Sequence, residues 1–177
     1  MSGADAGGGA AGMAGAATVL AFDVGSRRIG VAVGSRFGEG GRAVAVVDVR
    51  DGAPDWHALD RLCRDWQPGG LVVGDPLTLD DGDQPARLRA HAFARELQGR
   101  YGVPVVLVDE RSSSREAAQR FAGERAAGRR RRRDAATLDA MAAAVIFERW
   151  LAAPADAIDI DQVPPGAGAT TDGEAPG

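Results

Sequence analysis

The chain has 177 residues, a net charge of −4 and 45% hydrophobic residues, which is the size and composition of one globular domain with extensions. Its single cysteine, Cys63, excludes an intrachain disulfide and a zinc site built from cysteines. The N-terminal stretch lacks the basic region and continuous apolar run of a secretory signal, and no apolar run is long enough to span a bilayer. We therefore expect a cytoplasmic protein that does not associate with membranes.

The two ends of the chain differ from its middle. Residues 1–17 are almost all Ala and Gly, and residues 152–177 are rich in Pro, Gly, Ala and Asp. Neither stretch could bury enough apolar surface to offset its ordering entropy, so we predict that both are disordered. Six of the 25 acids lie in these ends, whereas all 21 bases, every one an arginine, lie in residues 18–151. The predicted domain, 18–151, is therefore mildly basic.

The domain begins with a pattern typical of three antiparallel strands. Residues 19–22 form a short apolar run that ends at Asp23, and the turn at residues 25–28 leads into a second apolar run at residues 29–34. These two runs predict a hairpin. After a glycine-rich turn, residues 43–49 predict a third strand.

Helices and strands alternate in the rest of the domain. Apolar residues at helical spacing predict a helix over residues 56–66, and Pro85 begins a second helix. Two compact apolar runs predict buried strands at residues 71–74 and 103–108. Ser113 and Glu116 form a capping box for a short helix that ends at Phe121, and the last helix runs from about Thr137 to Leu151.

This order of elements is β-β-β-α-β-α-β-α-α. A sheet that begins with a hairpin and is extended by right-handed βαβ crossovers implies a three-layer α/β fold. It is the element order of the ribonuclease H-like fold. We therefore predict a mixed five-stranded sheet, with three antiparallel strands followed by the crossovers.

Three acidic residues stand where the chain changes element. Asp23 closes the first strand, Glu110 follows the fifth strand, and Asp139 opens the last helix. Carboxylates at strand ends and helix starts tend to meet at one edge of a sheet, where they repel each other unless a cation joins them. Carboxylate and water oxygens are the ligands that Mg²⁺ and Mn²⁺ prefer. The pattern predicts metal-assisted cleavage of a phosphodiester.

Each acid also has a simpler interpretation. Asp23 could accept backbone hydrogen bonds in an Asx-turn, and its spacing to Gly25 and Gly30 also weakly resembles the phosphate-binding hairpin of actin-like ATPases, a fold that needs a longer chain. Asp109 and Glu110 point to opposite faces of the strand, so the residues alone do not choose between them. Both carboxylates could instead pair with nearby arginines such as Arg111.

Asp139 could simply favour the positive end of the helix dipole. However, Ala143, Ile146 and Trp150 share its helical face and should pack on the sheet. A carboxylate on a buried face needs a cation or strong hydrogen-bond donors. This favours a metal ligand.

A basic segment lies six residues before Asp139. It is a run of five arginines, namely Arg129, Arg130, Arg131, Arg132 and Arg133. Such a run is either a solvated loop or a loop that holds a nucleic-acid backbone beside the metal site. Arg27 and Arg28, in the turn after Asp23, and Arg111 are further candidates for phosphate contacts. His57 and His91 lie on predicted amphipathic helices, and we expect both at the surface.

Four segments together resemble the YqgF- or RuvX-like family of bacterial nucleases. They are LAFDVGSRRIGVAVG at 20–34, VVGDPL at 72–77 with Asp81 and Gly82, VDERSSSREA at 108–117, and the stretch from Leu138 to Leu151. The resemblance implies a metal-binding and catalytic triad of Asp23, Glu110 and Asp139, and thus favours Glu110 over Asp109. It also implies Mg²⁺ or Mn²⁺ as cofactor and processing of the 16S rRNA 5′ end in the cytoplasm.

The chain departs from the family pattern near the site. Asp75 stands where the family usually has an apolar residue before Pro76, Thr78 where it often has Asn, and Ser112 where it usually has an apolar residue. The triad is intact, but Asp75 could add negative charge near the site.

We therefore expect a metal-dependent nuclease that acts on RNA, namely pre-16S rRNA either free or ribosome-bound, as a monomer or homodimer. One alternative is a nuclease for four-way DNA junctions of the Holliday type, which would work as a two-fold dimer. A second is a nucleic-acid-binding module without catalysis.

Overall fold

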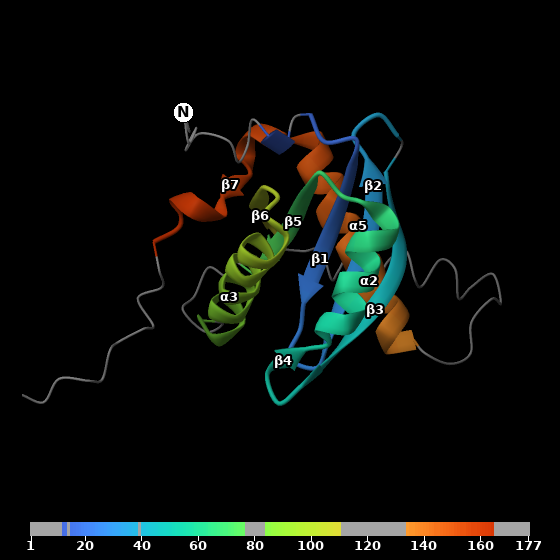
Figure 1. Ribbon diagram of the computed structural model, residues 1–177, viewed down its shortest axis with the longest axis vertical. Coiled ribbons are helices and arrows are strands. Elements are labelled where there is room, and N and C mark those ends of the chain that lie inside the picture. Colours follow the sequence, from blue (N-terminus) through green and yellow to red (C-terminus); the bar gives the residue numbers. More distant parts are fainter. Residues whose placement is uncertain (1–11, 14, 39, 77–83, 111–133, 165–177) are drawn as a thin grey trace, which may run out of the picture.

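The computed structural model describes residues 12–13, 15–38, 40–76, 84–110 and 134–164 (Figure 1). A mixed sheet forms its middle layer, with α2 (Trp56–Trp66) and α3 (Gln84–Tyr101) on one face and α5 (Asp134–Ala152) on the other (Figure 1). The strands in sheet order are β4 (Ala53–Pro54), β3 (Gly41–Arg50), β2 (Arg28–Ser35), β1 (Thr18–Val24), β5 (Gly70–Asp75), β6 (Val105–Asp109) and β7 (Ile158–Asp159). The short 3-10 helices η2 (Pro154–Asp156) and η3 (Ile160–Gln162) flank β7.

The strand directions follow the predicted arrangement. β1, β2 and β3 are antiparallel neighbours, whereas β5 and β6 extend the sheet parallel to β1. The prediction of a five-stranded sheet is wrong, because β4 and β7 add a short strand at each edge of the sheet. Each has only two residues, which is too short to produce an alternating pattern in the sequence. The predicted helix at residues 113–121 lies outside the described residues.

β1 is buried on both faces, and its alternating side chains enter two different cores. Leu20 and Phe22 pack with residues of α2 and α3, whereas Val19 and Ala21 pack with residues of α5. This alternation decides which later residues share a face, because neighbouring residues of a strand point in opposite directions.

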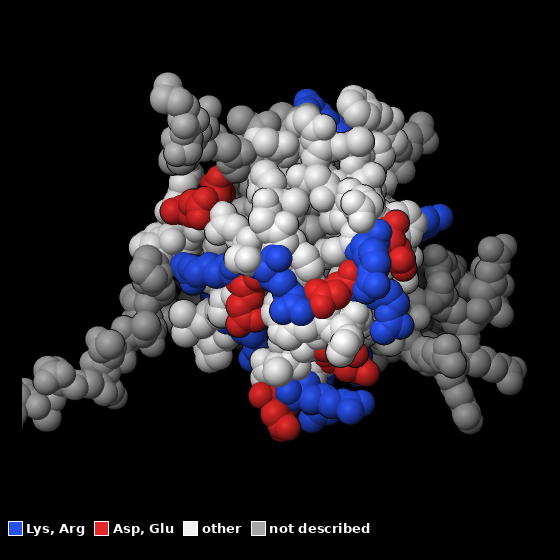
Figure 2. Space-filling view, viewed as in Figure 1, with Lys and Arg blue, Asp and Glu red and all other residues white. Residues whose placement is uncertain are grey.

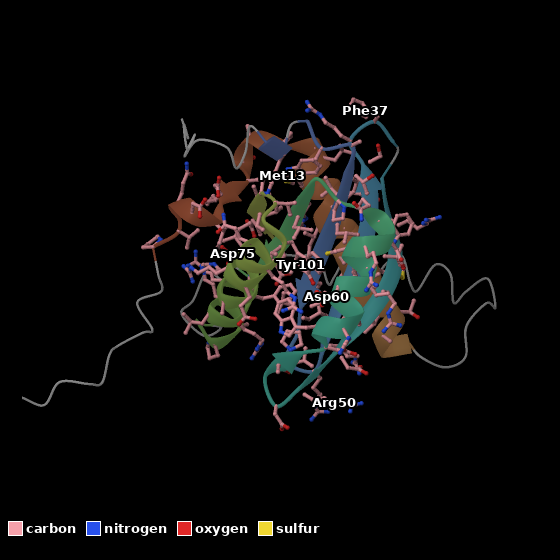
Figure 3. All side chains as sticks on the ribbon, viewed as in Figure 1. Met13, Phe37, Arg50, Asp60, Asp75 and Tyr101 are labelled. Carbon is pink, nitrogen blue, oxygen red and sulfur yellow. The ribbon has the colours of Figure 1, made fainter. Side chains whose placement is uncertain are left out.

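Large apolar and aromatic side chains fill the layer between the sheet and the helices α2 and α3. The ring of Phe93 meets that of Phe22 edge-on at 5.4 Å and stacks on that of Trp56 at 6.0 Å. Between the two helices, the Asp60 carboxylate accepts hydrogen bonds from Arg100 and from the Tyr101 hydroxyl at 2.7–2.8 Å (Figure 3). The two helices are therefore joined by a polar contact as well as by the core.

Small residues characterise the opposite face, where α5 lies close to the sheet. A side chain at Gly30 of β2 would collide with the backbone of Asp139, and one at Gly34 would collide with the Phe147 ring. Gly41 of β3 likewise lies against α5. These glycines let the helix backbone approach the strands, and they fix the height of Asp139 above the sheet.

The chain ends contribute more to the structure than their composition predicted. Met13 and Ala16 are buried, so the core begins before residue 18. The sequence predicted a disordered tail from residue 152, but in the structure β7 pairs with β6 and the Ile160 side chain is buried. Composition did not predict this ordered segment, because the buried Ile160 is a single apolar side chain between two acidic neighbours. The rest of both predicted tails lies outside the described residues.

None of the described helices is both long enough and apolar enough to cross a membrane.

Candidate functional site

Asp23 and Glu110 come together at the carboxyl ends of β1 and β6. Asp23 alternates in phase with Val19 and Ala21, and Glu110 in phase with Val106 and Val108, so both side chains lie on the α5 face of the sheet. Their carboxyl groups are joined by a hydrogen bond. The alternation places Asp109 on the opposite face. The geometry thus agrees with the choice of Glu110 that the family resemblance implied.

These two carboxyl groups stand in surroundings that oppose their ionisation. Burial raises the pKa of Asp23, and the nearby charge of Asp139 raises it further, although the hydrogen bond from Glu110 lowers it. Burial, together with the charge of Asp23, raises the pKa of Glu110 to about 9. These surroundings therefore disfavour the ionisation of both groups together, which favours one shared proton.

Glu110 also has one oxygen without a partner. Its Oε2 atom is buried and has no hydrogen-bond partner among the described residues. It lies against Gly74 of β5 and the side chain of Ile146 of α5, and only a glycine leaves room for it there. A buried carboxylate oxygen without a donor is costly, and it is the kind of atom that a divalent cation would satisfy.

Asp139 approaches this pair from α5. The helix begins at Asp134, so Asp139 lies in its second turn rather than in the first turn that the sequence predicted. The helix dipole acts mainly within the first turn, so it does not account for this acid. The Asp139 side chain, 31% exposed, accepts a hydrogen bond from Arg28 Nε at 2.8 Å. Its carboxylate is therefore near Asp23 but held by an arginine.

The donor set fits a divalent metal ion only in part. Within the described ranges, no three side chains of His, Cys, Asp or Glu are arranged as a ready metal site. The reason is that Asp139 Oδ2 faces Arg28, while Asp23 and Glu110 face each other. The acidic pair, with its buried and unpartnered oxygen, has the oxygen chemistry that Mg²⁺ and Mn²⁺ favour. The charge of Asp139 acts on Asp23, so this third carboxylate is near the pair.

The predicted nucleic-acid contacts have different outcomes. Arg27 is exposed in the turn between β1 and β2, and its carbonyl accepts a hydrogen bond from the backbone of Val49. Arg28 is paired with Asp139. The remaining candidates, Arg111 and Arg129–Arg133, lie outside the described residues.

Sequence analysis missed a second polar cluster at the same edge. The Asp75 carboxylate at the end of β5 is buried and contacts Arg87 and His91 of α3. The prediction that His91 is a surface residue is wrong, whereas His57 is exposed as predicted. The signal was present: Arg87 and His91 are four residues apart on a helix and so share a face, and Asp75 was the unusual residue opposite them.

Arg149 is a further residue that the sequence did not single out. It lies in the last turn of α5 and donates from Nη1 to the carbonyl oxygen of Asp109 at 3.0 Å. Its charge lowers the pKa of Glu110, against the larger effect of burial. Arg149 thus ties α5 to the end of β6 next to the acidic pair.

The visible charge on the α2 and α3 side is mixed. Among the described residues, arginines and acids alternate across this face rather than forming one basic field (Figure 2).

The chain matches, over residues 17–153, the family model described as RuvX, Holliday junction resolvase. The chain belongs to the RuvX family. The matched span contains both carboxylates of the acidic pair and Asp139. It also contains the Asp75 cluster on the other face of the sheet.

Two curated relatives are much more similar to this chain in sequence than Thermus thermophilus RuvC is. A Xanthomonas campestris pv. campestris (strain 8004) protein named "Putative pre-16S rRNA nuclease" is 75% identical over 141 residues, which is 80% of this chain and 91% of the relative. A protein of the same name from Xanthomonas axonopodis pv. citri is 76% identical over 137 residues, covering 77% and 88%. Thermus thermophilus RuvC has 18% identity and a TM-score of 0.49, over 80% of this chain and 99% of RuvC.

Proposed function

We propose that this RuvX-family protein is a metal-dependent nuclease that hydrolyses a phosphodiester bond at the 5′ end of pre-16S rRNA. The observation that carries the proposal is the half-buried Asp23–Glu110 pair at the carboxyl ends of β1 and β6, with one enclosed and unpartnered oxygen. Two carboxyl groups that oppose each other's ionisation are unfavourable for folding alone, and such perturbed acids are typical of functional sites. The name of the close relatives supports the RNA substrate.

Asp23, Glu110 and Asp139 would hold Mg²⁺ or Mn²⁺. A bound ion of this kind lowers the pKa of water and stabilises negative charge on a phosphoryl group. The protein contributes the positions of the ligands: β1 and β6 are parallel strands on either side of β5, and α5 is held against β2 by Gly30. Asp23 and Glu110 would release their shared proton when they become ligands.

The arginines around the pair would bind the RNA backbone. Arg27 and Arg28 follow Asp23 directly, and Arg111 follows Glu110 in the sequence. Together with Arg129–Arg133, they are the residues that we propose for phosphate contacts. Arginine suits this role because its guanidinium binds phosphate through two parallel hydrogen bonds.

A nucleophilic side chain is not required for this reaction. Burial raises the pKa of the Cys63 thiol to about 11, so this cysteine stays protonated and unreactive at neutral pH. Hydrolysis by water fits the acidic site better than covalent catalysis does. We expect the protein to act in the cytoplasm on free or ribosome-bound precursor RNA.

A second candidate function follows from the description of the family model, which names a Holliday junction resolvase. The same acidic site could cut DNA, and a four-way junction presents two equivalent cleavage positions. Such an enzyme would be a two-fold symmetric dimer. Sedimentation analysis that finds only monomer would count against this candidate. A binding module without catalysis would have no use for the acidic pair.

The test is cleavage of an RNA that carries the 16S 5′ leader, with Mg²⁺ or Mn²⁺ and with EDTA. We expect cleavage by the wild type only with the metal ion, no cleavage by Asp23→Asn, and RNA binding by both. Asp65→Asn, an exposed acid on α2, is the matched control and should cut normally. Cleavage by Asp23→Asn at the wild-type rate would contradict the proposal, and cleavage of a junction but not of RNA would favour the second candidate.

A further inference from the structure

Asp75 is a buried acid at the carboxyl end of β5, beside the proposed nuclease site but on the other face of the sheet. Only 4% of its side chain is exposed, and Figure 3 shows it next to α3. Its main-chain carbonyl accepts a hydrogen bond from the Glu110 N–H at 3.0 Å. Alternation along β5 directs Gly74 towards Glu110 and Asp75 towards α3.

The Asp75 carboxylate is fully engaged by two residues of α3. Arg87 donates from Nε to Oδ1 at 3.2 Å and from Nη2 to Oδ2 at 3.5 Å, which is a side-on pair. His91 donates from Nε2 to Oδ1 at 3.1 Å, and its side chain is only 8% exposed. Asp75 is thus a satisfied acid that holds the Arg87 guanidinium in one orientation.

Arg87 itself is not buried. Its side chain is 48% exposed, whereas those of Asp75 and His91 are almost completely enclosed. A guanidinium carries five N–H groups, and the contacts with Asp75 use two of them. Within the part of the chain that the structure describes, the other N–H groups of this guanidinium make no further hydrogen bond. Arg87 is therefore held in one orientation while part of its guanidinium faces solvent.

The position of Arg87 matters because of what lies next to it. Ligands of open α/β sheets bind outside the carboxyl ends of the parallel strands, and β5 is the strand between those that carry Asp23 and Glu110. The charge of Asp75 also reaches Glu110, since it contributes to the raised pKa of that residue. A nucleic acid that lies across the acidic pair would pass this edge.

We propose that Arg87, oriented by Asp75 and His91, binds a backbone phosphate of the nucleic acid close to the cleavage site. The inference rests on the proposed function for its substrate, a nucleic acid, but not on catalysis. An arginine that is already ordered loses less side-chain entropy when it binds a phosphate than a free one does. Neutralisation of Asp75 by the same contacts also limits repulsion between this acid and the phosphate.

The experiment measures binding of the 5′ leader RNA by the full chain in EDTA, at several salt concentrations. We expect Arg87→Ala to weaken binding about fourfold at 0.15 M salt and to reduce the salt slope by about 0.7, the value for one phosphate contact with single-stranded RNA. Arg87→Lys should keep the slope because it keeps the charge. Arg64→Ala is the control. It removes an equal charge from the last turn of α2, which lies near the start of β1 and thus at the other end of the parallel strands from Arg87.

Asp75→Asn separates an anchored arginine from a simple charge effect. This change removes a negative charge, so electrostatics alone predicts tighter RNA binding, whereas loss of the anchor predicts weaker binding. The double variant Asp75→Asn with Arg87→Ala should bind no more weakly than Arg87→Ala, because both act through the same guanidinium. Tighter binding by Asp75→Asn would overturn the anchoring role.

The melting temperature distinguishes a role of Arg87 in RNA binding from a purely structural role. We expect Arg87→Ala to lose RNA affinity at a temperature where it is fully folded. If Arg87→Ala melts earlier but binds RNA with the wild-type affinity and salt slope, the proposal is wrong. Because the assay contains EDTA, a protein that fails to cleave can still pass this test, so the two proposals fail independently.

Discussion

Glu110 and Asp75 are acids at the ends of adjacent strands, and their main chains are hydrogen-bonded to each other. Asp75 is buried, whereas Glu110 is half-buried with its Oε2 atom enclosed. Their side chains point to opposite faces of the sheet and meet opposite surroundings. Asp75 is met by an arginine and a histidine. Glu110 is met by a second carboxyl group, and one of its oxygens has no partner among the described residues.

The difference shows that burial alone does not mark a functional acid. Asp75 has the donors that a buried carboxylate requires, so it stabilises the packing of α3 on β5. Glu110 lacks them, and the surrounding structure holds it in an unfavourable place, as is common for residues that act on a ligand. Four experiments test this contrast between the two acids.

The largest expected effect is on catalysis by Glu110→Gln. Replacing a ligand of a catalytic metal ion removes several kcal/mol of transition-state stabilisation, so RNA cleavage should fall about a thousandfold. Asp75→Asn, in the same assay with saturating RNA, should keep most of the activity. Equal losses in the two variants would erase the distinction between the two acids.

The second effect is on stability, through the glycine that sets the height of α5. A methyl group at Gly30 would overlap the backbone of Asp139, which cannot move without the helix. We expect Gly30→Ala to reduce the free energy of unfolding by about 3 kcal/mol, measured by urea denaturation. The control is Gly99→Ala within α3, where an added methyl meets no neighbouring atom and should stabilise the protein by about 0.5–1 kcal/mol. If Gly30→Ala left the free energy of unfolding unchanged, α5 would not pack closely against β2.

The third effect is a smaller loss of stability in Asp75→Asn. The amide keeps the shape but weakens the hydrogen bonds from Arg87 and His91, so the free energy of unfolding should fall by about 1–2 kcal/mol. Glu110→Gln should instead leave the metal-free protein as stable as the wild type or more so, because the amide is neutral and needs no bound proton to avoid repulsion with Asp23. Thermal unfolding in EDTA compares the two directly, and destabilisation by Glu110→Gln alone would reverse our assignment.

The fourth effect is the pH dependence of the metal-free protein. The pKa of Glu110 is about 9 in the folded chain against an ordinary value of 4.5, so the folded state holds more protons between these values. The contribution of this group to stability is therefore full below pH 4.5 and is lost as the pH rises towards 9. In EDTA, the melting temperature of the wild type should fall by a few degrees more than that of Glu110→Gln between pH 6 and pH 8. Parallel curves for the two proteins would contradict it.

The sequence was sufficient for the main elements because their apolar patterns are strong. Residues 56–66 were predicted as a helix with the bounds that the structure shows, and the five long strands were found within two residues at most of their ends. The short strands β4 and β7 were missed, since two residues carry no periodic signal. Ile160 was missed because its neighbours are polar, and only tertiary contact with the edge of the sheet buries it.

The sequence pointed to candidate residues for the site but not to their contacts. Strand ends and helix starts pointed to Asp23, to Asp109 or Glu110, and to Asp139. Only the fold shows that Asp23 and Glu110 share a hydrogen bond and that Asp139 pairs with Arg28. The spacing of Arg87 and His91 places them on one face of α3, but only the packing of α3 on β5 shows that they contact Asp75. Packing determines which distant residues a charged side chain contacts, so these contacts can be identified only from the structure.

The most direct test of the central claim is a calorimetric titration with Mn²⁺ of the wild type, Glu110→Gln and Asp75→Asn. The account predicts saturable binding with release of protons by the wild type, strongly reduced binding by Glu110→Gln, and binding close to that of the wild type by Asp75→Asn. Undiminished Mn²⁺ binding by Glu110→Gln, or none by the wild type, would contradict the claim that the unsatisfied acid pair is a metal site.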